Sequence, residues 1–188
     1  VRRVGDYQTT GLYCGFMDDR FALPGDRVFG PMLEFLRELL LDSPKEKGAF
    51  LPDFVESEKK NLISTIESDR NDKRVYAITR LLRSMCAGDS FGVPRLGDTE
   101  DVAAITPEDL TRHYEEILRT SPIALFYVGS APEEEVEAAA KALIAGLPRE
   151  PMDLPAQTRF TPGAGGEDTE TMDVAQGKLC MGFTTPIT

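Results

Sequence analysis

Histidine and cysteine, two of the side chains that most often serve in metal and acid–base sites, are scarce in this 188-residue chain. The chain contains a single histidine, His113, in the segment LTRHYEEIL. A hydrolytic zinc site needs three histidine, cysteine or carboxylate ligands around an open position, and neither HExxH nor HxxEH occurs in the sequence. Helical spacing places His113 beside the core-facing Tyr114 and among polar neighbours. We therefore interpret His113 as a solvated or edge-packed side chain.

Three further patterns offer only weak catalytic alternatives. The segment CAGDS, residues 86–90, lacks the GxSxG spacing, and one histidine leaves few bases for a serine or cysteine nucleophile. The segment GAGG, residues 163–166, has neither Walker spacing nor a following helical pattern, which favours a flexible tether over a phosphate-binding loop. Carboxylate pairs such as Glu115 and Glu116 are expected in so acidic a chain, and we interpret them as solvated faces.

Composition excludes several classes of partner. The formal net charge of −11 opposes binding to nucleic acid or to anionic lipid, because phosphate contacts require clustered lysine and arginine. No apolar run approaches the roughly 20 residues of a membrane-spanning helix. Cys14, Cys86 and Cys180 are odd in number and lack CxxC spacing, which favours buried thiols in a reducing compartment. We expect a cytoplasmic protein without nucleic-acid or membrane partners.

Two helices are predicted in the first half of the chain. Apolar residues recur at helical spacing over residues 28–40, with either Asp26 as the N-cap or a regular start nearer Gly30. A second helical pattern covers residues 51–88, and its only breaker-like position is Asn71–Asp72. This pattern predicts one long helix that is bent there or two consecutive helices.

Two more helices are predicted in the second half. Thr106 is a candidate N-cap, Pro107 suits the first helical position and Asp109 follows the cap by three residues, so a helix should start here and run to about Thr120. The segment GSAPEEE opens another helix, since acidic side chains favour the positive end of a helix, and this helix should end near Gly146.

Strand patterns separate and follow these helices. Residues 9–17 are rich in β-branched and aromatic residues, residues 122–130 form an apolar run between turn signals, and residues 169–185 read as two strand-like pieces. The order of elements predicts an α+β fold with a mostly antiparallel sheet and helices packed on one face. A doubly wound parallel sheet ranks second, because it would need a more regular alternation of strands and helices.

The organisation predicted from these patterns has three parts. Residues 1–147 form a truncated α+β domain, residues 148–168 form a linker rich in proline and glycine, and residues 169–188 are the strand-like start of a following domain. The chain lacks an initiating methionine and stops inside an apolar, strand-like segment. We expect it to be a piece of a longer polypeptide.

Four stretches resemble the M16 peptidase family, the group of insulin-degrading enzyme, pitrilysin and mitochondrial processing peptidase. They are FLPDFVESEKKNLISTIESDRNDKRVYAITRLLRSMCAGDSFG, LGDTEDVAAITPEDLTRHYEEIL, IALFYVGSAPEEEVEAAAKAL and QGKLCMGF. Their order and separations cover essentially the whole chain. The resemblance implies repeated α+β domains with the LuxS/processing-peptidase-like metallohydrolase fold, which enclose a chamber around unfolded peptide substrates.

The resemblance also assigns the position of a zinc ligand. Active members of the family hold zinc with two histidines of an HxxEH motif upstream of this chain and with a glutamate on the long helix. The family pattern around that glutamate falls on Glu58 to Ile66 and places Thr65 at the ligand position. A neutral hydroxyl lacks the charge of a carboxylate, so we expect no zinc, no other cofactor and no catalytic residue in this fragment. If the alignment shifts by two residues, Glu67 becomes the ligand and the whole protein an active peptidase.

Thr65 also has a purely structural interpretation. Its side chain can pack beside Leu62 while its hydroxyl donates a hydrogen bond to the carbonyl of Asn61, as threonines inside helices often do.

The resemblance is strongest to the non-catalytic bacterial members of the family, including those associated with modification of elongation factor P. It rests on NDKRVYA and DVAQGKLCMGF. It implies a subunit that binds peptide or unfolded polypeptide and pairs with an active, HxxEH-bearing partner, or that self-associates through its last strand. The alternatives are part of an active zinc metalloendopeptidase whose HxxEH lies upstream of residue 1, and an interaction domain unrelated to proteolysis.

Overall fold

The computed structural model describes residues 2–4, 7–154 and 165–184 and divides the chain into two compact units. Each unit is assembled from segments that are distant in sequence. The first unit contains residues 1–9, 53–105 and 155–188, and the second contains residues 10–52 and 106–154.

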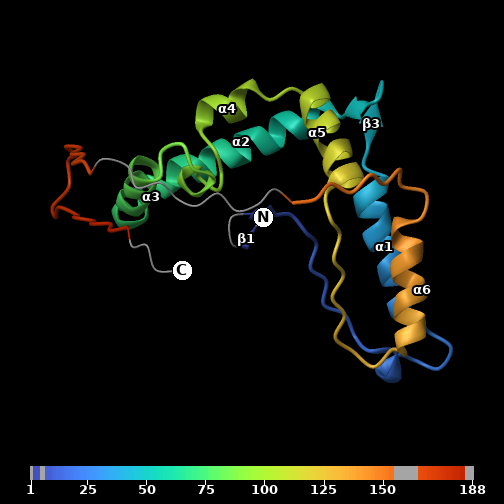
Figure 1. Ribbon diagram of the computed structural model, residues 1–188. Helices are drawn as coiled ribbons and strands as arrows, with labels where there is room; N and C mark the ends of the chain where they lie inside the picture. The colour runs from blue at the N-terminus through green and yellow to red at the C-terminus, as the bar shows by residue number, and fades with distance from the viewer. Residues whose placement is uncertain (1, 5–6, 155–164, 185–188) are drawn as a thin grey trace. The chain divides into compact units, whose positions relative to one another are not determined.

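Three helices dominate the first unit: α2 (Pro52–Asp69), α3 (Lys73–Met85) and α4 (Thr99–Ala104) (Figure 1). The break predicted at Asn71–Asp72 is confirmed, and it separates α2 from α3. The Asp72 carboxylate caps α3 by accepting hydrogen bonds from the backbone N–H groups of Arg74 and Val75 at 3.0 and 3.2 Å. Because these two N–H groups have no acceptor within the helix, the cap fixes where α3 begins.

Smaller contacts complete the first unit. An antiparallel hairpin pairs β1 (Arg2–Val4) with β2 (Tyr7–Thr9), and a 3₁₀ turn, η2, covers Ser90–Gly92. The Lys59 side chain of α2, only 14% exposed, donates a hydrogen bond to the Ile105 carbonyl at the end of α4. This bond joins two residues that lie 46 positions apart in the sequence.

The second unit begins with α1 (Phe29–Leu41), which follows a 3₁₀ turn, η1 (Asp19–Phe21). The helix lies where the sequence predicts it, but Asp26 does not cap it. Asp19 supplies the acceptor instead, since its Oδ1 receives hydrogen bonds from the N–H groups of Val28 at 2.7 Å and Phe29 at 3.1 Å. The Asp19 carboxylate lies nine residues before Val28 in the sequence, and it accepts from backbone N–H groups at the start of the helix that have no acceptor within the helix.

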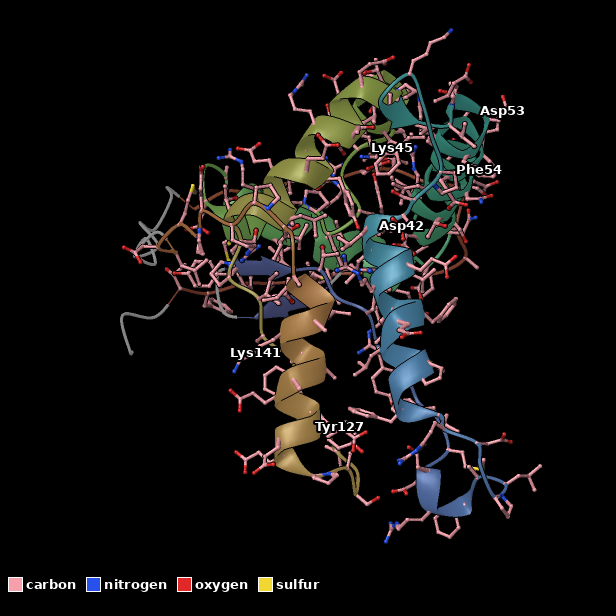
Figure 2. The ribbon with its side chains drawn as sticks, turned by 90° about the vertical axis from the view of Figure 1, so that its right-hand side faces the viewer. Asp42, Lys45, Asp53, Phe54, Tyr127 and Lys141 are labelled. Atoms are coloured by element: carbon pink, nitrogen blue, oxygen red, sulfur yellow. The ribbon has the colours of Figure 1, made fainter. Side chains whose placement is uncertain are left out.

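A two-stranded hairpin lies against α5 in the same unit. The hairpin pairs β3 (Lys45–Glu46) with β4 (Ala49–Phe50), and α5 covers Pro107–Thr120. The predicted cap is confirmed, because the Thr106 hydroxyl accepts from the Asp109 N–H at 3.1 Å. Figure 2 shows Lys45 beyond the end of α1, and its ammonium group lies 2.6 Å from the Glu115 carboxylate.

Thr111 is the best-buried polar side chain among the described residues of this unit, at 3% exposure. Its hydroxyl accepts from the Phe50 N–H at 2.9 Å and donates to the Pro107 carbonyl at 2.6 Å. Both bonds are needed, since a buried polar group without a partner is costly.

The last helix, α6 (Glu133–Ile144), packs beside α1 (Figure 1). Arg37 of α1 donates to carbonyls in the last turn of α6, including that of Leu143 at 2.9 Å. A cation at this end complements the helix dipole and satisfies carbonyls that have no helical donor. Gly146 follows with a φ of 84°, a left-handed conformation that glycine adopts freely, and it ends the helix where predicted.

The segments predicted as long strands are not assigned as strands in the described structure, apart from Thr9, which belongs to β2. Residues 10–17, 122–128 and 169–184 form no hydrogen-bonded ladder within the described part of the chain. A strand needs a neighbour for its backbone groups, and a strand-like sequence does not supply one. The strands that are present pair antiparallel beside helices, which agrees with the α+β class, whereas the described residues contain no single sheet covered on one face.

The domain boundaries predicted at residues 147 and 168 stay a prediction. Residues 155–164 of the predicted linker lie outside the described residues. Within the described part of the chain, no helix is both long enough and apolar enough to span a membrane.

Candidate functional site

Thr65 lies in the second half of α2 and is exposed. Its Oγ1 donates a hydrogen bond to the Asn61 carbonyl at 2.8 Å, as predicted. The hydroxyl proton is therefore used within the helix, four residues back along the same face. In this geometry Thr65 completes a turn of helix and presents no anionic oxygen.

Glu67 lies two residues further along α2 and is also exposed. At about 100° per residue, the two side chains leave the helix about 200° apart, so they do not converge on one ion. The described residues contain no group of three or more histidine, cysteine, aspartate or glutamate side chains that could hold a metal ion. Thr65 and Glu67 therefore do not act together as ligands of one metal ion.

The other sequence candidates remain dispersed. His113 is exposed on α5, in agreement with a solvated histidine, and it belongs to the second unit whereas Thr65 belongs to the first. Cys86 is 4% exposed at the end of α3. Residues 163 and 164 of GAGG lie outside the described residues, and no helix follows Gly165 and Gly166 in the described segment.

One charged cluster does bring distant residues together, within the first unit. We call three residues the basic cluster: Arg70, in the turn that precedes α3, and Tyr76 and Arg80, on one face of α3. The Arg80 guanidinium donates to both Asp168 and Glu170, and its Nε lies 3.1 Å from the Asp168 Oδ2. One planar guanidinium thus binds two carboxylates that are two residues apart in sequence.

Glu170 is held by all three members of the basic cluster. Besides the contact with Arg80, its Oε2 accepts from the Tyr76 hydroxyl at 2.7 Å and its Oε1 accepts from Arg70 at 3.1 Å. The guanidinium carbons of Arg70 and Arg80 lie 5.6 and 6.0 Å from the centroid of the Tyr76 ring. These are cation–π distances, so the ring helps to position both cations.

The environment of Glu170 favours its ionised form. The Tyr76 hydroxyl, followed by the guanidinium groups of Arg70 and Arg80, lowers the pKa of Glu170 below its ordinary value. The Glu170 side chain is 27% exposed and that of Arg80 is 40% exposed. The contact is therefore partly shielded from water yet open to ions, and its strength should depend on salt.

The segment beyond Glu170 also approaches α3. A Cβ placed on Gly182 would lie 2.6 Å from the sulfur of Met85 and 3.3 Å from Cδ2 of Leu81. Only a residue without a side chain fits this approach without displacing Met85. The end of the described chain therefore meets α3 a second time, at an apolar surface.

Sequence reasoning missed the basic cluster. It placed Asp168 in a linker and Glu170 in a following domain, on opposite sides of a predicted boundary. The available signal was charge: α3 has the sequence KRVYAITRLLRSM, with four basic residues and no acidic one, in a chain of net charge −11.

Comparisons with known proteins bear on these observations. The family model described as "Peptidase M16 inactive domain" matches residues 104–188. A relative in Bacillus subtilis (strain 168), "Probable inactive metalloprotease YmfF", is 28% identical over 163 residues. The match covers 83% of this chain and 37% of the relative.

A solved structure is similar as well. The crystal structure of a conserved protein from Enterococcus faecalis V583 matches with a TM-score of 0.64 and 26% identity, over 71% of this chain and 31% of that one. The chain thus spans about a third of the length of each relative.

Proposed function

We propose that this chain is part of a non-catalytic bacterial member of the M16 peptidase family, which the matched family model and the Bacillus subtilis relative support. We further propose that the whole protein binds unfolded polypeptide and pairs with an HxxEH-bearing active subunit. The non-catalytic subunit would complete the wall of a chamber in which the partner cuts the peptide bond. Thr65 would occupy the position of the third zinc ligand of an active member.

The hydrogen bond from Thr65 to Asn61 carries this proposal. A zinc ligand at this position must present an anionic or lone-pair oxygen away from the helix. The Thr65 hydroxyl is neutral and donates its proton to the helix at 2.8 Å. Compared with an active member that has glutamate here, the position of Thr65 lacks one unit of negative charge. The helix α2 itself is retained as part of the fold.

Extended segments in the second unit support the binding part of the proposal. Tyr13, Phe126 and Val128 are 97%, 92% and 100% exposed, on segments whose sequences are typical of strands. Strand-like backbone that is not in a ladder can accept a further strand, from a partner subunit or from an extended peptide.

The proposal includes a cytoplasmic location. Cys14, Cys86 and Cys180 form no disulfide in the described part of the chain, which supports a reducing compartment. Oxidising conditions would leave an odd number of thiols open to intermolecular pairing.

The test is to purify the intact protein alone and together with the HxxEH-bearing protein of the same organism. We expect the pair to co-elute, to cleave an unfolded peptide and to lose activity with a chelator. We expect the intact protein alone to bind that peptide without cleaving it. Thr65→Ala should leave the activity of the pair unchanged, because Thr65 holds no metal.

One result would overturn the proposal. If the intact protein alone cleaves the peptide, retains stoichiometric zinc through dialysis and loses both with Glu67→Gln, it is an active metallopeptidase whose ligand is Glu67. Failure to bind either the peptide or the partner would also contradict it.

A further inference from the structure

Two short segments of the first unit have opposite and concentrated charge. The thirteen residues of α3 include Lys73, Arg74, Arg80 and Arg83 and no acid. Residues 167–173, EDTETMD, contain four acidic residues and no basic one. In a chain with 32 acidic and 21 basic residues, a helix without acids is an exception, and an acidic ligand is the partner that its charge suits.

The contacts between these segments are selective. Arg80 and Tyr76 lie four residues apart on α3 and therefore on one face of the helix. They bind Asp168 and Glu170, whereas no contact of the neighbouring Glu167 with the cluster is recorded among the described side chains. In an extended segment, residues two apart point to the same side. The basic cluster thus binds two carboxylates whose spacing would place them on one side of an extended chain.

We propose that Arg70, Tyr76 and Arg80 form a binding site for two carboxylates spaced two residues apart on an extended polypeptide. Asp168 and Glu170 occupy this site in cis, and an acidic peptide of the same spacing binds there in trans when they are removed. The proposal concerns the first unit alone and does not depend on a peptide chamber or on a partner subunit.

The geometry explains why spacing matters. A guanidinium offers donors along more than one edge, so Arg80 can hold Asp168 through Nε and Nη2 and Glu170 through Nη1. Tyr76 and Arg70 then take the second carboxylate only. A single carboxylate would fill half of the site, and carboxylates on adjacent residues would face opposite sides of the chain.

The cis occupant should normally prevail. The hydrogen bonds already place Asp168 and Glu170 against the basic cluster, so their binding is intramolecular, and an intramolecular ligand has an effective concentration well above micromolar. A free peptide at micromolar concentration therefore cannot compete until the internal carboxylates are neutralised. This predicts that the site is hidden in the wild-type protein and is revealed by two isosteric substitutions.

The experiment uses the intact protein and a fluorescent peptide with the sequence of residues 166–172, GEDTETM. Binding is measured by anisotropy at low salt, about 20 mM, where charged contacts are screened least. We expect the variant Asp168→Asn/Glu170→Gln to bind the peptide at least about tenfold more tightly than wild type. Adding Arg80→Gln should abolish this binding.

Matched variants separate the site from overall charge. Arg74→Gln removes the same charge from an exposed position of α3, and Glu167→Gln removes an acid beside the occupied pair. When added to the variant Asp168→Asn/Glu170→Gln, which we call the vacated variant, neither substitution should change peptide binding by more than about twofold, the size of a weak surface effect. A peptide with asparagine and glutamine in place of its second and third acids should not bind.

Three results would overturn the proposal. The vacated variant could bind no better than wild type, although circular dichroism shows that both are folded. Arg74→Gln could weaken binding as much as Arg80→Gln, which would indicate a diffuse field. Inorganic phosphate could displace the peptide at equal concentration, which would show that the cluster accepts any anion.

Discussion

Two segments that lie outside the helices and strands are held against a helix by different forces. In the second unit, residues 122–128 approach α1 through Tyr127, whose ring meets the Phe29 ring edge-on at 5.1 Å between centroids. In the first unit, residues 167–170 are held on α3 through the basic cluster. An apolar contact excludes water and should be insensitive to salt, whereas a charged contact at a wet surface weakens as ions are added.

The two contacts also differ in how strongly they should stabilise. Phe29 is 4% exposed and contacts a second ring, Phe16, with centroids 6.2 Å apart. Ion pairs at exposed positions contribute little to stability, because side-chain ordering and solvent screening offset their attraction. The contact of Phe29 with Tyr127 should therefore determine whether the second unit folds. The contact of the basic cluster should determine only where residues 167–170 lie.

Replacing Phe29 should give the largest effect. Phe29→Ala leaves a cavity between the rings of Phe16 and Tyr127, and it should lower the free energy of unfolding by about 3 to 5 kcal/mol. Urea denaturation of the intact protein measures this change. Phe35→Ala is the matched control on the same helix, since Phe35 is 49% exposed and should cost much less. Equal losses for the two variants would show that the ring contact does not hold the second unit.

The N-cap of α3 should give the next largest effect. Asp72→Ala removes the acceptor for the N–H groups of Arg74 and Val75 and should destabilise the helix by about 1 kcal/mol. Because Tyr76 and Arg80 lie on that helix, the contact with residues 167–170 should loosen as well. Hydrogen exchange at Arg74 and Val75 reports the cap directly. Asp72→Asn keeps a capping oxygen and should remain close to wild type, and a loss as large as that of Asp72→Ala would contradict the role of the cap.

These helix ends show what sequence can and cannot predict. Thr106 and Asp72 act within three residues of their own positions, so local rules identified the start of α5 and the break before α3. Asp19 caps α1 from nine residues away, and a local rule chose Asp26 instead. The difference is distance along the chain, since a local pattern contains no information about where a folded-back loop places an acceptor.

The same limit applies to the segments that the sequence predicts as long strands. The sequences of residues 9–17 and 122–130 predict strands, but only Thr9 is assigned to one, because pairing depends on a neighbour that no local pattern specifies. The basic cluster joins Arg80 to residues about ninety positions away. Thr65 is the opposite case, because its hydrogen bond partner lies four residues back in the same helix and was predictable.

Releasing the charged contact should have a smaller, local effect. Arg80→Gln removes the donor shared by Asp168 and Glu170, so a glutamate-specific protease should cleave after Glu170 about two- to fivefold faster. Cleavage after Glu46, which is exposed in the second unit, is an internal reference, since that site is remote in sequence from the basic cluster and from residues 167–170. Arg74→Gln should change neither rate. An unchanged rate after Glu170 in Arg80→Gln would show that the basic cluster does not hold the segment.

The smallest effect concerns the protonation of Glu170. Its pKa is lowered in the folded protein, so its contribution to stability is fully present above the ordinary glutamate pKa of about 4.3 and is lost as pH falls through the lowered value. No change should therefore occur between about pH 7 and pH 5. Tyr76→Phe removes the hydrogen bond that is the main cause of the lowered pKa and should raise the pKa of Glu170 towards its ordinary value.

A carbon-13 titration of the Glu170 carboxyl group measures this shift, with Arg74→Gln as the control that should leave the pKa unchanged. The Phe29 contact contains no carboxyl group and lies in the other unit, so the stability of the second unit should not follow the Glu170 titration. If Tyr76→Phe leaves the Glu170 pKa at its wild-type value, the tyrosine does not bind the carboxylate. The arginines would then hold the segment by charge alone. Tyr76 would not contribute to the preference of the basic cluster for two spaced carboxylates.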